Sequence, residues 1–134
     1  MSEYEPEDTI ALGGLTLTFS PTVHSDPCNA IRVTDGRASL VYGADGSPSD
    51  ALVRFASDVD LLLLEATFAD DAQTAAAHGH MTARQAGEVA AAAGARRLVL
   101  THLLPREPQL REVAEQAYDG PVELAREGLS YDLG

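Results

Sequence analysis

Carboxylate and imidazole side chains follow several of the apolar runs in this sequence. Asp45, Glu65 and His102 each stand at or shortly after the end of such a run, and His24 follows a fourth one. Because loops at the carboxyl ends of strands gather the polar groups of a site in α/β sheets, we expect these four side chains to approach one another. Carboxylates and imidazoles together suit an ion such as Zn²⁺ or Mn²⁺. The pattern therefore indicates a metal site, although its residues are dispersed along the chain.

Each candidate ligand also has an interpretation that involves no metal. Asp45 lies in the segment Gly43–Gly46, which has the composition of a turn. Glu65 could simply cap the segment that follows it, and His102 could be a buried histidine hydrogen-bonded to the backbone. From the residues alone, a metal site and a purely structural set both stay open.

The other two histidines and the single cysteine have different expected roles. His80 comes just before a predicted helix N-terminus, where the helix dipole disfavours a protonated imidazole. We expect His78, in a loop-like segment, to be solvated. Cys28 is expected to be a small buried apolar group, because no neighbouring residue marks it as a nucleophile.

The elements that must position these residues begin with a small antiparallel meander. Leu15–Phe19 alternates apolar residues with threonines, which predicts a half-buried strand, and Gly13–Gly14 suits a tight turn before it. The apolar runs Ala30–Val33 and Ser39–Tyr42 are separated by an Asp-Gly pair, which is a strong hairpin signal.

Farther along the chain, strands alternate with helices. The run Leu61–Leu64 predicts a strand covered on both faces, and Leu98–Leu100 predicts another short strand. Val122–Leu124 and Leu129–Tyr131 are candidates for terminal strands. This alternation predicts an α/β domain, an α+β layered arrangement with antiparallel hairpins at its front.

Helix-start signals occur at three places. The run 47–50 predicts a helix with Ser47 as its N-cap and Pro48 at the first helical position. Thr82 and Gln85 have the spacing of a capping box, and the helix that follows would end at Gly94. Pro108 would open a third helix, which Asp-Gly at 119–120 would close.

Length and composition limit the possible classes of protein. The chain has 134 residues, of which 45% are hydrophobic, so it can form one domain over residues 10–134 behind a disordered lead-in at residues 1–9. Its net charge of −12, with arginine as the only basic residue type besides histidine, argues against independent binding to nucleic acid or an anionic membrane. The single cysteine excludes an internal disulfide. We expect a soluble cytoplasmic protein.

Five segments, in order and with consistent spacing, resemble motifs of metallo-β-lactamase-fold hydrolases of the ribonuclease Z-like branch. They are similar to its His-x-x-Pro, Gly-Asp-Thr, Glu-Ala-Thr, His-Ser-Thr and Thr-His motifs and lie at Thr22–Pro27, Tyr42–Pro48, Leu64–Phe68, Gly79–Ala86 and Leu100–Leu103. The resemblance covers the chain from residue 10 onward and implies the C-terminal half of an αββα sandwich. Its function would be metal-dependent hydrolysis of a phosphodiester or an ester.

The resemblance also implies roles for individual residues. Asp45 would bridge two zinc ions, and His102 would bind one of them. His80 would polarise the scissile group or protonate the leaving oxygen, with Glu65 holding it in place. His24 is not a ligand in this match and is expected to support the site or the fold. The ions would convert a bridging water into the attacking hydroxide.

One part of the family pattern is missing from this chain. The metal motif His-x-His-x-Asp-His does not occur, so Asp45 and His102 are the only ligands that the resemblance supplies. Two ligands do not enforce the geometry of a dinuclear site. We therefore expect the chain alone to be inactive. It would need the missing N-terminal half, or a homo- or hetero-oligomeric partner, to cover an apolar sheet face.

Three functions remain open at this point. The chain could be part of a metal-dependent hydrolase, a non-catalytic binding or assembly module that has lost its metal site, or a small hydrolase using one ion at Asp45, His102 and His80. The resemblance implies ribonuclease Z-like processing of tRNA, but the net charge of −12 repels a polyanion. Small esters, lactones or nucleotide-like phosphodiesters are the favoured substrates.

Overall fold

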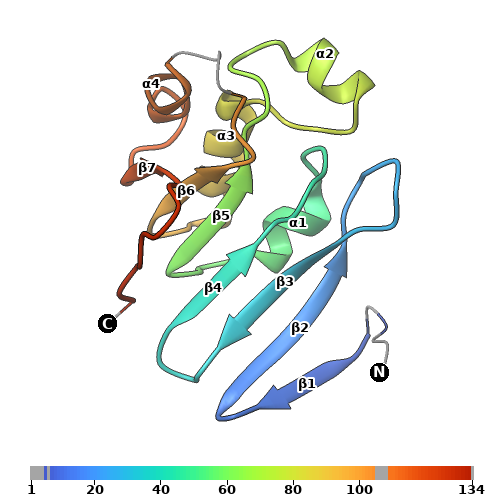
Figure 1. The fold of residues 1–134 in the computed structure, drawn as a ribbon, viewed down its shortest axis with the longest axis vertical. Helices are drawn as coiled ribbons and strands as arrows, with labels where there is room; N and C mark the ends of the chain where they lie inside the picture. Colours follow the sequence, from blue (N-terminus) through green and yellow to red (C-terminus); the bar gives the residue numbers. More distant parts are fainter. Residues whose placement is uncertain (1–4, 6, 105–108, 134) are drawn as a thin grey trace.

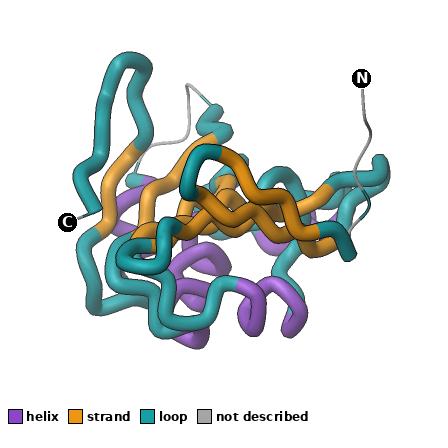
Figure 2. Tube along the Cα trace, turned by 90° about the horizontal axis from the view of Figure 1, so that it is seen from below, coloured by secondary structure: helices purple, strands orange, loops and turns teal. Residues whose placement is uncertain are grey.

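The computed structural model describes residues 5, 7–104 and 109–133. Within them, seven strands form one mixed sheet in which the spatial order follows the sequence order, from β1 to β7 (Figure 1). Viewed close to edge-on, α1 and α3 lie on one side of the sheet, and the segment after β7 loops over the other side (Figure 2). The predicted α/β class is confirmed. No described helix is long and apolar enough to span a membrane.

The first half of the sheet is the predicted antiparallel meander. Its strands are β1 (Thr9–Leu12), β2 (Leu15–Pro21), β3 (Asn29–Thr34) and β4 (Ser39–Tyr42). Gly13 and Gly14 connect β1 to β2 with φ values of 56° and 86°, a conformation that glycine adopts without strain. In the β3–β4 turn, Asp35 accepts hydrogen bonds from the amides of Arg37 and Ala38.

The second half of the sheet is parallel and alternates with helices. Strands β5 (Leu61–Glu65), β6 (Leu98–Thr101) and β7 (Val122–Leu124) continue from β4 in parallel register. The helices are α1 (Asp50–Phe55), α2 (Ala72–Ala77), α3 (Ala83–Ala93) and α4 (Leu110–Glu115). Because parallel strands share one carboxyl edge, the loops after β4, β5 and β6 meet there.

Helix α3 begins and ends as predicted. The Thr82 side chain accepts a hydrogen bond from the Gln85 amide at 3.1 Å, and the Gln85 side chain accepts one from the Thr82 amide at 2.9 Å. Gly94 closes the helix in the left-handed conformation, with φ at 68°. The capping box therefore fixes the loop that carries His80 to the start of this helix.

The predicted start of α1 was wrong by two residues. The N-cap is Ser49, which accepts from the Leu52 amide, whereas the Ser47 amide donates to the Val23 carbonyl at 2.8 Å. Ser47 therefore joins the Asp45 turn to the loop after β2 instead of starting a helix. Helix α2, which Asp71 caps at its N-terminus, was not predicted.

The C-terminal part differs from the prediction in two ways. Residues 129–131 do not form a strand, because this segment crosses a face of the sheet, with the Arg97 guanidinium 5.3 Å from the centre of the Tyr131 ring. Helix α4 ends at Glu115, several residues before the predicted Asp-Gly stop. Its predicted opening residue, Pro108, lies outside the described residues. So does most of the predicted lead-in, although Thr9 already belongs to β1.

The two faces of the sheet are covered differently. Alternate residues on β5 and β6 pack under α1, α3 and α4 in one core cluster that includes Leu62, Leu64, Leu98 and Leu100, all fully buried. We call the opposite face the open face. Strand registers place these apolar side chains on it: Ile10, Leu12, Leu15, Leu17, Val33, Leu40, Tyr42 and Leu63. Several of them are exposed, with Leu12 at 65% and Tyr42 at 41%.

Candidate functional site

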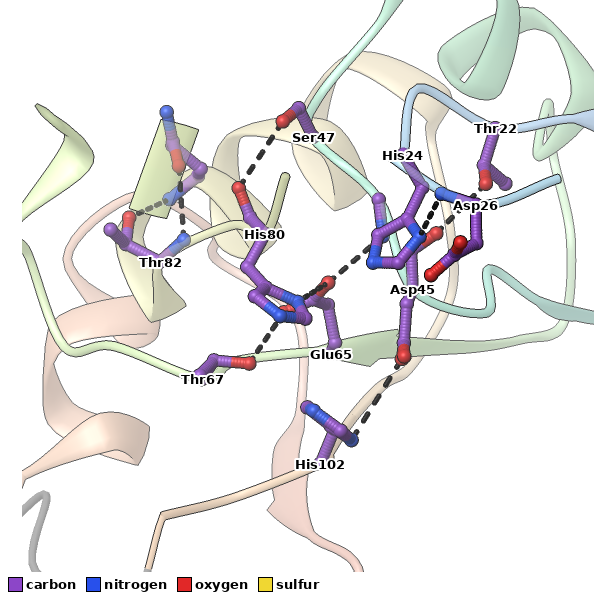
Figure 3. A network of polar contacts seen from close by, with 12 residues as sticks. Thr22, His24, Asp26, Asp45, Ser47, Glu65, Thr67, His80, Thr82 and His102 are labelled. Carbon is purple, nitrogen blue, oxygen red and sulfur yellow. Dashed lines mark hydrogen bonds and ion pairs between the residues drawn. The ribbon is translucent and has the colours of Figure 1, made fainter. Parts of the chain in front are cut away.

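The carboxyl edge of the parallel strands brings most of the predicted site residues together. Asp45 follows β4, Glu65 ends β5 and His102 follows β6, while His80 enters from the loop before α3 (Figure 3). His24 joins them from the loop after β2. Residues that are far apart in the sequence therefore line one small region.

Glu65 is the buried centre of this region. It is 1% exposed, and both of its carboxylate oxygens accept hydrogen bonds. Oε1 accepts from the Gly46 amide at 2.9 Å and contacts His80 Nδ1 at 2.8 Å, while Oε2 accepts from the Thr67 hydroxyl at 2.7 Å. These bonds offset the cost of burying a carboxylate, so Glu65 is not a simple cap for the segment that follows it.

The contact with Glu65 defines the proton arrangement of His80. A carboxylate oxygen can only accept a hydrogen bond, so Nδ1 carries a proton and, in the neutral ring, Nε2 carries the lone pair. The His80 amide also donates to the Ala75 carbonyl at 2.9 Å, which anchors the loop to α2. The His80 ring is stacked on His102 at 5.3 Å between centroids, with an interplanar angle of 26°.

Asp45 and His102 face each other with neither of them buried. His102 Nδ1 lies 3.8 Å from Asp45 Oδ1, and the two side chains are 49% and 34% exposed, respectively. The interpretation of His102 as a buried histidine is therefore wrong. Both segments hold a non-glycine residue in the left-handed region, with φ at 54° for Ala44 and 53° for His102. Such backbone strain is concentrated at functional sites in proteins.

The loop after β2 supports the Asp45 turn. The Thr22 hydroxyl donates to the Asp45 carbonyl at 2.8 Å. His24 Nδ1 accepts a hydrogen bond from the Asp26 amide, and the His24 ring meets His80 edge-on at 5.5 Å. On its other side, His24 borders a cavity of about 470 Å³, which Cys28 also lines. Cys28 is half-buried, not fully buried as predicted.

Two more residues complete the comparison with the predicted site. His78 is exposed at the end of α2, where it contacts Phe68 and none of the site residues. Tyr42, which the sequence analysis did not select, lies near the site on the open face. Burial raises the pKa of its hydroxyl, and the negative charges of Asp45 and Glu65, together with Cys28, raise the pKa further.

The types of donor atom in the site suit a divalent cation, but the number of donors is too small. Two donors that each lie about 2.1 Å from one ion can be at most about 4.2 Å apart, and the 3.8 Å between Asp45 and His102 is within this limit. However, the described residues contain no group of three potential ligands. A stable zinc site requires three or four protein ligands, so these two side chains form only part of one.

A family model, a relative and a solved structure relate this chain to known proteins. Residues 1–103 match the model of the "Beta-lactamase superfamily domain". The chain is 38% identical over 131 residues to the probable metallo-hydrolase YhfI of Bacillus subtilis, covering 96% of this chain and 53% of YhfI. The crystal structure of YhfI matches 94% of this chain with a TM-score of 0.88.

Ribonuclease Z proteins are also similar. The chain is 48% identical over 99 residues to ribonuclease Z of Myxococcus xanthus, which covers 70% of this chain and 32% of that protein. The crystal structure of the short form of human tRNase Z matches 96% of this chain with a TM-score of 0.77 and 25% identity. The chain therefore spans about half the length of YhfI and about a third of the length of the bacterial ribonuclease Z.

Proposed function

The chain belongs to the beta-lactamase superfamily and is similar to ribonuclease Z, and on that premise we propose that it forms part of a zinc-dependent hydrolase. The observation that carries the proposal is the placement of Asp45 Oδ1 and His102 Nδ1 3.8 Å apart, beside the His80 ring. Such a hydrolase would cleave a phosphodiester or an ester. The zinc ions, when bound, would supply a metal-activated hydroxide as the nucleophile.

Each residue of this chain would have a distinct role. Asp45 would hold metal through its carboxylate, and His102 through its imidazole. His80 would act on the scissile group, because Glu65 fixes its Nδ1 as the protonated nitrogen and leaves Nε2 to hold or release a proton at the leaving oxygen. Glu65 would orient the ring without touching the substrate, and His24 would support His80 from its other side.

The partner would be the half of the protein that this chain lacks. YhfI is about twice as long as the matched region, so further residues accompany this fold in that relative. The open face offers exposed Tyr42 beside the site and exposed Leu12 and Leu15 at the opposite end of the sheet, and exposed apolar side chains of this kind mark interaction surfaces. We place the missing half on the open face, where it would add the other metal ligands.

The substrate would be small. The net charge of −12 repels a polyanion such as tRNA unless the missing half supplies compensating basic residues. Among the described residues, Glu5 and Asp26 line the cavity around His24, and no arginine does. A small ester, lactone or nucleotide-like phosphodiester fits these surroundings better than a long nucleic acid.

Zinc titration by calorimetry tests the proposal. The chain alone should bind zinc weakly, and adding the part of YhfI that this chain does not cover should tighten binding by roughly tenfold or more. His102→Ala should abolish that gain, whereas His78→Ala, at an exposed histidine outside the site, should preserve it. Absence of zinc binding in both mixtures would instead support a non-catalytic module.

Tight binding of one zinc by the chain alone, lost in His102→Ala, would support the small single-metal hydrolase. That outcome would contradict the proposal that the missing half completes the site. The three functions therefore give three different titrations.

A further inference from the structure

The two oxygens of the Glu65 carboxylate have different partners. Oε2 contacts only the Thr67 hydroxyl in the hydrogen bonds described, at 2.7 Å, and Oε1 serves both the Gly46 amide and His80 Nδ1. Gly46 directly follows Asp45, so one oxygen atom connects the turn that carries Asp45 to the ring of His80. The two parts of the candidate site are thus tied to a single carboxylate orientation (Figure 3).

A glutamate side chain does not hold such an orientation by itself. Its terminal torsion has a broad, roughly two-fold profile, so the carboxylate can rotate unless hydrogen bonds fix it. The Thr67 hydroxyl is a short, charge-assisted donor, and Thr67 is only 5% exposed. With Oε2 occupied, Oε1 is the oxygen that faces Gly46 and His80.

We propose that Thr67 is a positioning residue that locks the Glu65 carboxylate and so aligns the Asp45 turn with His80. The inference rests on the proposed function, because alignment matters only if Asp45 and His80 act together. Thr67 contacts no reacting group and works through Glu65. The hydroxyl of Thr67, and not its methyl group, fixes the Glu65 carboxylate.

A threonine that only fills space and a threonine whose hydroxyl holds Glu65 should respond differently to substitution. If Thr67 only fills space, Thr67→Val should leave the His80 ring unchanged, because valine has nearly the same shape. If the hydroxyl holds Glu65, valine should free the carboxylate while the fold stays intact. Thr67→Ser, which keeps the hydroxyl and removes the methyl group, should behave like the wild type.

The test uses the 134-residue chain without metal and NMR of the histidine rings. In the wild type, ¹⁵N shifts should show His80 protonated at Nδ1, with a slowly exchanging ring proton. Thr67→Val should mix the two neutral tautomers and speed hydrogen exchange of the Gly46 amide by roughly tenfold, and Thr67→Ser should restore both signals. The ring of His78, outside the site, is the internal control.

Two results would overturn the proposal. One is an unchanged His80 tautomer and unchanged Gly46 exchange in Thr67→Val; the other is a failure of Thr67→Ser to restore them, which would assign the effect to the methyl group. If Thr67→Val does not fold, Thr67→Ala is measured in the same way, because alanine removes the hydroxyl without placing a methyl group against the carboxylate. Since no zinc is present, failure of the zinc titration and failure of this test are separate results.

Discussion

The two faces of the sheet have similar apolar side chains but very different surroundings. On the helix-covered face, Leu62 and Leu64 are fully buried beneath helices that this chain supplies itself. On the open face, Leu12 and Leu15 are 65% and 40% exposed. The C-terminal segment covers only part of that face, with Leu133 beside Leu15 in a cavity of about 250 Å³.

This difference shows which part of the fold is complete. A sheet with apolar residues on both faces needs a layer on each side, and the described residues supply one full layer. The candidate site follows the same division. Leu61, Leu63 and Glu65 alternate along β5 toward the open face, so Glu65 and its partners belong to that side of the sheet, where Leu61 and Glu65 are themselves buried. Stability should therefore depend mainly on the helix-covered face, and function mainly on the other.

Removing a large side chain from the helix-covered face should have the largest effect. Leu64→Ala should lower the free energy of unfolding by about 2–5 kcal/mol, because it leaves a cavity in a fully packed core. Chemical denaturation monitored by circular dichroism measures this loss. A change below about 1 kcal/mol would contradict the assignment of this face as the stable core.

A close contact between two helices should give the next effect. A Cβ added to Gly87 of α3 would lie 2.6 Å from the Ala114 carbonyl oxygen of α4. Gly87→Ala should therefore destabilise the protein by about 1–3 kcal/mol, despite the better helix propensity of alanine. In the matched control, Ala92→Gly at an exposed position of the same helix, the denaturation midpoint should report propensity alone. Stabilisation by Gly87→Ala would show that α3 and α4 pack less closely.

The elements that the sequence predicts correctly are those with a local physical cause. The capping box at Thr82, the Gly-Gly turn before β2 and the continuous apolar run of β5 each depend on neighbouring residues, and all are present. Helix α2 was missed although its Asp71 cap is local, whereas two other errors depend on distant contacts. Ser47 does not cap α1 because its amide pairs with Val23, and the segment at 129–131 lies across the sheet instead of joining it.

The same division applies to the candidate site. The strand-end rule places Asp45, Glu65 and His102 at one edge, because it depends only on the positions of the strands. The supporting contacts of Gly46 and Thr22 use backbone atoms and could not be read from side-chain types. Thr67 could have been selected, because it belongs to the segment that resembles the Glu-Ala-Thr motif.

On the open face, a leucine substitution should have little effect on the stability of this chain. Leu12→Ser should change the free energy of unfolding by no more than about 0.5 kcal/mol, because the side chain is mostly exposed. It should also reduce binding of an apolar dye and self-association, measured by fluorescence and analytical ultracentrifugation. A loss of stability like that of Leu64→Ala would mean that the C-terminal segment or another part of this chain covers the face.

The smallest expected effect concerns the border between the open face and the site. The pKa of Tyr42 is raised by burial and then by nearby negative charges, with Asp45 the first of them. Asp45→Asn removes that charge, so forming the phenolate becomes less unfavourable and the Tyr42 pKa should fall part of the way toward its ordinary value. The pKa of Tyr118, raised by burial alone, should not move. Carbon-13 NMR of the tyrosine rings resolves both titrations. An equal change in the pKa of both tyrosines would show a general loosening of the fold. No change in either pKa would show that the charge of Asp45 does not act on Tyr42.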